Sequence, residues 1–538
     1  MARSEAPGTR ILPAAALALG FMTALQGQPA SGAAAIAGGG QPGPALPGGT
    51  GITPIGVGTD TAGRRSTITP GIRASIVASD NPDLQPRGAE RSGTRYELAP
   101  YVRATLDSPR ALADAVYTLR GQIRDGGTNP SDEVRHDLRA WADLRLSAEA
   151  LRLSARANVF DVNVSPFGAA SFDPGAQGDN RTQYREFELS PYLSGRFGGD
   201  GGYTARYRIR DAEPGSGLPG NVVNAVSGST RSDLSARRLA GSLQADVYDV
   251  DYDNGLAYRG ADVDLLGWYR VDTGLRVGAG AGYSRNDILF NDRGENDGWG
   301  ASLAFEWVPD RRTSVRGRWS DRYYGSSAQL RASHRSASGV FGLDYFTGVR
   351  DGNQSGLYGY DTNRLFTGRS QTGVPVPTGT DPVTESLVDR ELLPGTGTSF
   401  GSGVAASPLV YTDTLVASAG WLSGRNALVA SAFVNNRRTA AAFATGVRED
   451  TEQIGGRLDF TRRLGPRSAL RAFAGQTVSE SDLSDSRATL SVLGAFWDYR
   501  LSARVTTTLG ARLQRQRGTG ITVEYDEAAA SASLDYRF

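Results

Sequence analysis

The sequence has no cysteine and no lysine, and it has only two histidines. Without cysteine the chain can form no disulfide, and it has no thiolate for catalysis or metal binding. All 58 basic residues are therefore arginine, and 57 acidic residues leave a formal net charge of +1. This balance gives no global field that would favour nucleic acid as a partner. We attribute the arginine bias to a GC-rich genome rather than to selection for arginine chemistry.

The chain has only one long apolar run, and it lies near the N-terminus. Arg3 and Arg10 mark a basic start, Ile11–Leu25 is largely apolar, and small residues follow. This run is too short for a comfortable membrane helix but suits a signal peptide, which we predict over residues 1–37, with a retained anchor helix as the alternative. Residues 38–66 are rich in glycine and proline and are predicted to be a flexible linker.

After the linker, apolar and polar residues alternate in one segment after another. A period of two places alternate side chains on opposite faces of a β-strand. Leu138–Leu146, Leu151–Val159 and Tyr203–Arg210 show this clearly, each with arginines on its polar face. Leu490–Leu501 and Ala427–Val434 carry apolar residues on both faces, so the sequence leaves their orientation open.

Short turns and long loops alternate between these segments, as they do in outer-membrane barrels, where the short turns are periplasmic. We therefore predict that residues 67–538 form an all-β, transmembrane, antiparallel up-and-down β-barrel of about 22 strands, within a range of 18 to 22. The segment 351–408 is predicted to be a long extracellular loop. A soluble sandwich would need several cores with linkers between them, and a solenoid would need a short fixed period. The strands are expected to begin near Ile68, Thr94, Ala111, Val134, Leu151, Tyr184, Gly202, Ala225, Ser242, Ala257, Leu275, Trp299, Thr313, Ser327, Gly339, Val410, Ala427, Gln453, Ser468, Ala488, Val505 and Ile521.

The last alternating segment ends the chain on an aromatic residue. Leu534, Tyr536 and Phe538 share one face of it. This arrangement resembles the signal that the barrel-assembly machinery reads, whereas the end of an ordinary soluble chain tends to fray. We therefore expect export through the inner membrane and location in the outer membrane, with outer-membrane lipid and the assembly machinery as partners.

Two stretches resemble the outer-membrane barrel family associated with PEP-CTERM and exosortase systems. Ala78–Pro100 is similar to that family's first hairpin, although Pro82 stands where a small apolar residue is usual. Glu306–Arg335 is similar to a second block, with an Arg-aromatic-aromatic-Gly turn followed by Ser333-His334-Arg335. The resemblance implies an outer-membrane barrel linked to exopolysaccharide or envelope systems, with no assigned catalytic residues.

The polar strand faces supply candidates for lining the lumen, namely Arg139, Trp141, Arg145, Arg152, Arg156, Arg206, Arg208, Arg316 and Arg318. Rings of arginine can select anions in a pore. The alternative is that a polar interior simply needs charge, balanced by acids such as Asp143, Asp262 and Asp264. Trp141 could also stack on a sugar ring. Aromatic residues at strand ends suit interfacial girdles, and we assign to them Tyr101, Trp268, Trp299, Trp307, Tyr323 and Trp421.

Two further groups could carry chemistry. One group is the acidic run Asp246, Asp249, Asp251 and Asp253. These residues are candidate ligands for calcium, which prefers six to eight oxygen ligands, but alternation can equally place them on the lumen face of a strand. We favour the lumen face. His136 and His334 are predicted at opposite ends of the barrel, so they cannot form one catalytic site. We therefore expect no enzyme, no metal and no cofactor.

These features favour a porin-like conduit for an exopolysaccharide, another envelope polymer or a small anionic solute. The alternative is a structural or assembly barrel with a plugged lumen, and an outer-membrane hydrolase is a remote third. The segment 351–408 contains six acidic and three basic residues. Because it is acidic and the lumen is rich in arginine, we hypothesise that it folds into the mouth and narrows it, although water and salt weaken the attraction.

Overall fold

The computed structural model describes the predicted barrel region with gaps at several connections. The described residues are 65–108, 110–127, 133–146, 151–171, 180–197, 201–215, 220–232, 238–255, 257–287, 296–323, 325–336, 338–351, 409–439, 450–481 and 484–538. The predicted signal peptide, nearly all of the linker and the segment 352–408 therefore lie outside the described residues.

The described residues form 22 β-strands, which confirms the predicted fold class and strand number. Every strand begins within four residues of its predicted start, including the two in the region 225–252, where the pattern is weakest. The strands are β1 Arg65–Ser79, β2 Gly93–Ser108, β3 Ala111–Gly126, β4 Glu133–Arg145, β5 Leu151–Asn163, β6 Arg181–Phe197, β7 Gly201–Pro214, β8 Asn221–Ser232, β9 Leu239–Tyr252, β10 Ala257–Arg270, β11 Leu275–Asn286, β12 Asp297–Trp307, β13 Thr313–Arg322, β14 Gly325–Arg335, β15 Gly339–Asp351, β16 Leu409–Ser423, β17 Asn426–Thr439, β18 Thr451–Gly465, β19 Ser468–Ser481, β20 Ser486–Arg500, β21 Val505–Thr519 and β22 Tyr525–Arg537.

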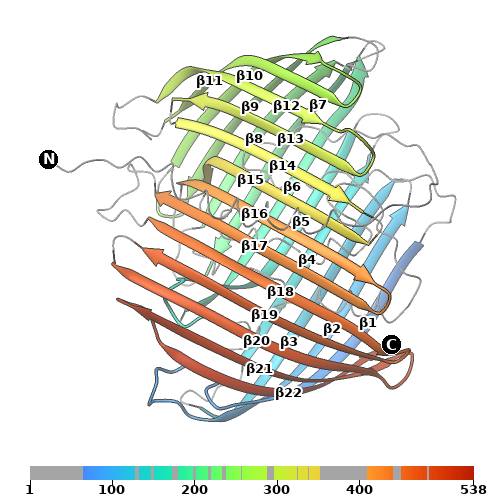
Figure 1. The fold of residues 1–538 in the computed structure, drawn as a ribbon, viewed down its shortest axis with the longest axis vertical. Helices are drawn as coiled ribbons and strands as arrows, with labels where there is room; N and C mark the ends of the chain where they lie inside the picture. The colour runs from blue at the N-terminus through green and yellow to red at the C-terminus, as the bar shows by residue number, and fades with distance from the viewer. Residues whose placement is uncertain are drawn as a thin grey trace.

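Each strand pairs antiparallel with the next, and the first pairs with the last (Figure 1). The closing seam joins β1 to β22 from Gly71 opposite Arg537 to Ser79 opposite Ala529. Closure leaves no strand edge with unpaired backbone groups, which lipid could not satisfy. The chain is thus a closed 22-stranded barrel.

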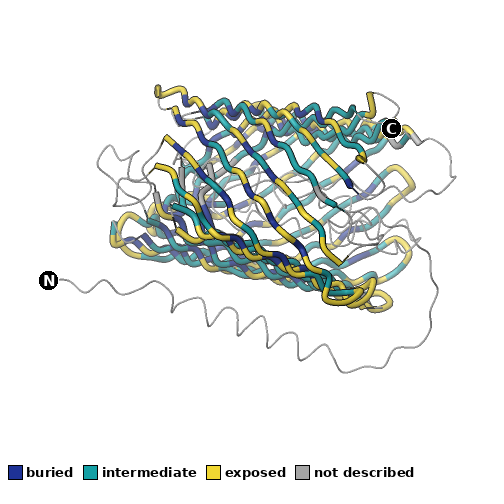
Figure 2. The backbone as a smooth tube through the Cα atoms, turned by 90° about the horizontal axis from the view of Figure 1, so that it is seen from above, coloured by how far each residue is buried: buried dark blue, intermediate teal, exposed yellow. Residues whose placement is uncertain are grey.

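Side chains alternate between an apolar outer face and a polar inner face along each strand. In β12, Leu303 and Phe305 are exposed on the outside, while Ser302 and Glu306 are buried on the inside. The burial colours alternate in the same way along the tube in Figure 2. An apolar belt outside and a polar lumen inside is the arrangement of a transmembrane barrel of the outer-membrane type. Within the described part of the chain, no helix is long and apolar enough to cross a membrane.

The two ends of the barrel differ in their connections. At the end where the chain stops, Phe538 donates its backbone N–H to the carbonyl of Pro70, and the strands are joined by short connections. In two of these turns a carboxylate, of Asp272 or of Asp310, accepts backbone N–H groups two and three residues later. By the rule for outer-membrane barrels this is the periplasmic end. The opposite end, with the longer connections, is extracellular.

The structure orients the two segments that the sequence left open. In β17, Phe433 is buried on the inner face. In β20, Trp497 is exposed on the outside, whereas Phe496 faces inward in phase with Asp498. The ring of Phe496 covers Gly510 on the neighbouring strand, where no Cβ could fit. Gly455 and Gly494 stand in the same way opposite Phe433 and Phe473, so glycine at these positions lets a large ring lie flat on the inner wall.

Candidate functional site

The structure places all nine predicted lumen residues on the inner face of the barrel. β13 shows the phase most directly, because Arg316 and Arg318 contact inward acids while Trp319 is exposed outside. The other lumen residues are Arg139, Trp141 and Arg145 on β4, Arg152 and Arg156 on β5, and Arg206 and Arg208 on β7. They belong to two groups with different surroundings.

On β10–β13 the inward arginines are paired with carboxylates. Arg316 lies 2.9 Å from Glu306, and Arg318 lies 2.9 Å from Asp264. Arg322 contacts the same Asp264 at 2.6 Å. For this wall the alternative interpretation holds, in which arginines balance the acids of a polar interior. Such ion pairs hold the side chains of this wall in place and add little net positive charge to the lumen.

The wall of β18–β22 is neutralised in the same way and carries aromatic rings as well. Arg471 forms a two-pronged bond with Asp498, and Arg457 does so with Asp459. The guanidinium of Arg457 lies 4.5 Å above the ring of Phe473, which is the geometry of a cation–π contact. The rings on this wall are therefore covered by arginine.

The wall of β4–β7 is different, because several of its arginines have no carboxylate partner. In the described part of the chain, Arg139, Arg206 and Arg208 form no ion pair. The carbon of the Arg206 guanidinium lies 4.6 Å above the ring of Tyr192. The nearby acid Asp143 accepts a hydrogen bond from the Tyr192 hydroxyl at 2.7 Å. Asp143 is therefore oriented by a phenol, and the guanidinium groups of Arg139, Arg206 and Arg208 face the lumen with no carboxylate in contact among the described residues.

A short stretch after β5, residues 164–171, reaches across the extracellular mouth, and we call it the mouth segment. The N–H of Val523 donates to the carbonyl of Phe167 at 3.0 Å, and the side-chain amide of Gln516 donates to the same carbonyl at 3.3 Å. The hydroxyl of Tyr525 donates to the carbonyl of Ala170. Phe167 is fully buried as a result. Because β21–β22 lie around the barrel from β5, with β1–β4 between them, this stretch spans part of the opening.

Sequence reasoning did not find this mouth segment and assigned the narrowing role to 351–408 instead. The base of the mouth segment is organised by Asn180, whose side chain bonds the backbone of Ser165 and Ala169. Glycine and asparagine in the loop between β5 and β6 indicate a turn, but they do not indicate that the loop folds across the mouth. The hypothesis for residues 352–408 lies outside the described residues.

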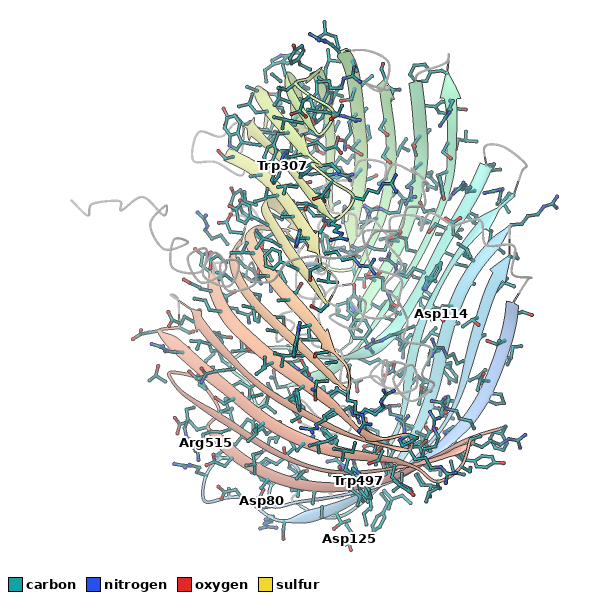
Figure 3. All side chains as sticks on the ribbon, turned by 45° about the vertical axis from the view of Figure 1, so that its right-hand side comes forward. Asp80, Asp114, Asp125, Trp307, Trp497 and Arg515 are labelled. Atoms are coloured by element: carbon teal, nitrogen blue, oxygen red, sulfur yellow. The ribbon has the colours of Figure 1, made fainter. Side chains whose placement is uncertain are left out.

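Two aromatic residues that were assigned to the interfacial girdles point into the lumen instead of toward the lipid. Trp299, Trp307 and Trp421 are exposed on the outer face, and Trp299 is 79% exposed. The prediction is wrong for Trp268, which is 9% exposed and donates to the hydroxyl of Ser242 inside the barrel. It is also wrong for Tyr101, whose hydroxyl reaches the inward carboxylate of Asp535. Both lie in phase with inward residues. Figure 3 shows side chains on the strands around the barrel, with Trp307 on β12 and Trp497 on β20 labelled.

The acidic run near residue 250 does not share one face, so its assignment to the lumen is only partly right. Asp246 is buried on the inner face, bonded to Gln244. Asp249 belongs to the outer face, where it pairs with the exposed Arg259. No cluster of three possible metal ligands occurs among the described residues.

The two histidines lie at opposite ends of the barrel. His136 is near the extracellular end of β4, with Nδ1 2.8 Å from the Tyr117 hydroxyl. His334 is at the periplasmic end of β14, with Nδ1 3.0 Å from the Thr313 hydroxyl. They cannot act on one substrate group.

Comparisons with known proteins give fold neighbours but no family. No protein-family model matches the chain, and no curated protein matches it in sequence. Among solved structures, the siderophore receptor PirA of Pseudomonas aeruginosa is 9% identical, with a TM-score of 0.41 and coverage of 88% of this chain and 80% of that one. A mutant ferric enterobactin receptor, PfeA, of the same organism is 12% identical, with a TM-score of 0.44 and coverage of 87% and 81%. OccK5 of that organism is 8% identical, with a TM-score of 0.31 and coverage of 88% and 98%.

Proposed function

We propose that this protein is a passive conduit of the outer membrane that favours anionic solutes. The observation that carries the proposal is the β4–β7 wall, where Arg139, Arg206 and Arg208 face the lumen without ion pairs in the described part of the chain. Unpaired guanidinium groups along a pore attract anions and repel cations. The walls of β10–β13 and β18–β22 are balanced by ion pairs, so the arginines of β4–β7 give this part of the lumen a positive field.

We also propose that the conduit serves an exopolysaccharide or other envelope polymer. Support comes from the resemblance of Ala78–Pro100 and Glu306–Arg335 to the PEP-CTERM-associated barrel family. The first stretch falls on the β1–β2 hairpin and the second on β12–β14. Trp141 lies on the arginine-rich wall and offers an aromatic face for a sugar ring.

Ion selectivity in planar bilayers tests the conduit. The refolded chain should give open steps, and a KCl gradient should give a reversal potential that favours chloride. Replacing Arg139, Arg206 and Arg208 by Gln should shift that potential toward zero. The matched control is Arg331→Gln with Asp344→Asn, which removes an inward ion pair of 2.5 Å without changing net charge. Equal reversal potentials in wild type, triple variant and control would contradict the role of the arginine wall.

A structural or assembly barrel with a plugged lumen is the second candidate, and the mouth segment favours it. The bonds from Gln516 and Tyr525 hold that segment across part of the opening. A plugged barrel would insert into bilayers and stay silent at all voltages, whereas the conduit conducts.

A further inference from the structure

Arginine recurs at every periplasmic hairpin of the barrel. Ten hairpins join consecutive strands at this end, and each has an arginine in its turn or at the strand end beside it. One from each hairpin, in chain order, is Arg110, Arg145, Arg196, Arg238, Arg270, Arg312, Arg335, Arg425, Arg467 and Arg504. The chain ends with one more, Arg537, beside the last residue. The short-turn end of the barrel is therefore ringed by cations.

Many of these arginines lie side by side across neighbouring hairpins. In six places the backbone N–H of an arginine at a strand end donates to the carbonyl of an arginine in the preceding periplasmic turn, at 2.7 to 2.9 Å. The pairs are Arg145 with Arg110, Arg270 with Arg238, Arg335 with Arg312, Arg463 with Arg425, Arg500 with Arg467, and Arg537 with Arg504. We refer to these twelve residues as the periplasmic arginine ring.

The ring faces the mouth of the lumen and not the lipid. Arg500 follows the inward Asp498 by two residues, and Arg537 follows the inward Asp535 by two. The same phase holds for Arg145, two residues after Asp143. Residues directly opposite each other in an antiparallel ladder point to the same face. The turn members of the pairs therefore also border the opening.

Four described carboxylates at the periplasmic end are already engaged. Asp498 is bonded to Arg471 and Thr508, and Asp535 is shared between Arg73 and Arg537. The carboxylates of Asp272 and Asp310, in the turns themselves, accept backbone N–H groups. Those N–H groups keep the pKa of Asp310 below its usual value.

Among the residues that the structure describes, the turn members of the ring have no acid of their own. Within the described residues no ion pair is formed by Arg110, Arg238, Arg312, Arg425, Arg467 and Arg504. Like charges placed directly opposite each other repel. An external anion that lies beside the turn members would relieve this repulsion.

We infer that the periplasmic arginine ring is a binding site for a linear polyanion that carries one carboxylate per repeating unit, such as a chain of uronic acids. The inference rests on the proposed conduit and names the class of polymer that enters it. Guanidinium binds carboxylate through two parallel hydrogen bonds, which gives each pair a specific contact. The pairs are spaced around an opening instead of gathered in one patch, so a flexible chain engages several at once and gains from multivalency.

The charge distribution gives this site a direction. At the extracellular end acids and arginines occur together and several of them are paired. Arg515 and Arg517 both contact Asp526, and Arg438 contacts Asp413. The turn members of the ring form no such pairs in the described part of the chain, so a polyanion is attracted more strongly to the periplasmic mouth, which suits a site where the polymer is captured before it moves outward.

One-sided block of the current tests the inference. Oligogalacturonate is added to either chamber of a bilayer that holds the wild-type barrel, with neutral dextran of similar length as the control polymer. Block should occur from the side of the short turns only, should weaken as salt rises, and should not occur with dextran. Block by polyphosphate without block by oligogalacturonate would overturn the carboxylate assignment.

Variants distinguish binding at the periplasmic arginine ring from general attraction by the positive charge of the barrel. Arg425→Gln, Arg467→Gln and Arg504→Gln together should weaken block by about tenfold or more, because several charge-assisted contacts are lost. Arg→Lys at the same positions should also weaken block, although less, because lysine keeps the charge and loses the two-pronged contact with a carboxylate. Arg462→Gln is the matched control, since Arg462 is exposed on the outer face of the same hairpin. Equal block in the triple variant and in this control would overturn the inference.

A second measurement keeps the inference distinct from the conduit. If the barrel inserts but carries no current, the proposed conduit fails, and binding is then read from the anisotropy of fluorescent oligogalacturonate with the full chain in detergent. Binding that the triple variant loses supports the ring as a docking site on a closed barrel. Absence of binding there overturns the inference independently.

Discussion

Tyr192 on β6 donates a 2.7 Å hydrogen bond to the carboxylate of Asp143 on β4, across the whole width of β5. Directly beside this bond, the guanidinium carbons of Arg206 and Arg152 lie 4.6 and 6.0 Å from the centre of the tyrosine ring. The phenol thus orients the Asp143 carboxylate, which forms no ion pair with Arg152 or Arg206 among the described residues. The hydroxyl does not change the net charge of the wall, but it fixes where the negative charge of Asp143 lies relative to these arginines.

Removing that hydroxyl should lower the anion preference of the pore. In Tyr192→Phe the Asp143 carboxylate is free to turn toward Arg152, which loses its own 3.5 Å bond to the phenol. We expect the reversal potential in a KCl gradient to move toward zero, with a loss of folding stability of about 1 kcal/mol from one hydrogen bond. Tyr203→Phe, on the outer face of β7, is the matched control and should leave selectivity unchanged. An unchanged reversal potential in Tyr192→Phe would show that Asp143 does not set the local charge.

Releasing the mouth segment should open the pore further. Gln516→Ala with Tyr525→Phe removes the side-chain bonds to the carbonyls of Phe167, Gly168 and Ala170. Single-channel conductance should rise, because the segment then keeps only part of its contacts with the β21–β22 hairpin, among them the backbone bond from Val523 and the bond from Gln514 to Ser171, besides its base at Asn180. Gln476→Ala, an exposed glutamine on β19, is the control. Equal conductance in all three proteins would mean that the segment does not limit flow.

The face assignment can be tested on one strand. Leu153 lies on the outer face of β5, opposite Leu144, whereas the adjacent Ser154 faces the lumen. Leu153→Arg should cost about 2–4 kcal/mol if the residue is near the lipid midplane, and Ser154→Arg should cost much less. Urea unfolding in lipid vesicles measures both. Similar losses would mean that the two faces are not lipid and lumen.

The fold was predictable from sequence because lipid imposes a simple rule. Every residue of a spanning strand faces either hydrocarbon or the lumen, so alternation, together with the rhythm of short turns and long loops, predicted the 22 strands and the inward face of the nine lumen candidates. Trp268 was misplaced because its position at a strand end was weighed above its phase, although it lies in phase with Asp264. Phase is the stronger signal, since a shift of one residue moves a side chain from one face of the barrel wall to the other.

The pairing of arginines and the path of the mouth segment could not be predicted in the same way. Gln516 is separated by 349 residues from Phe167, whose carbonyl it bonds. No local pattern reports such a contact, because it depends on which strands closure brings near one another. The same holds for Arg318, which meets Asp264 only through the register of β10–β13.

The N-terminal prediction is tested by the mature protein itself. We expect mature protein to begin between Ser31 and Gly38 and to fractionate with the outer membrane. N-terminal sequencing of the membrane fraction checks both statements. Recovery of the cleaved chain in the soluble periplasm would contradict the location.

The C-terminal aromatic should matter for assembly more than for stability. Phe538 is 66% exposed on the outer face and meets Tyr536 edge-on, with ring centroids 5.0 Å apart. Its side chain therefore buries little and is available to the barrel-assembly machinery. Phe538→Ala should reduce the amount of heat-modifiable, folded barrel in the outer membrane several-fold, while refolding into detergent in vitro stays near the wild-type yield. Ile521→Ala removes another exposed apolar side chain, at the extracellular end, and should leave both measurements unchanged. If Phe538→Ala lowers the yield of refolding in vitro as strongly as assembly in cells, the residue acts through the stability of the β1–β22 seam and not as a recognition signal.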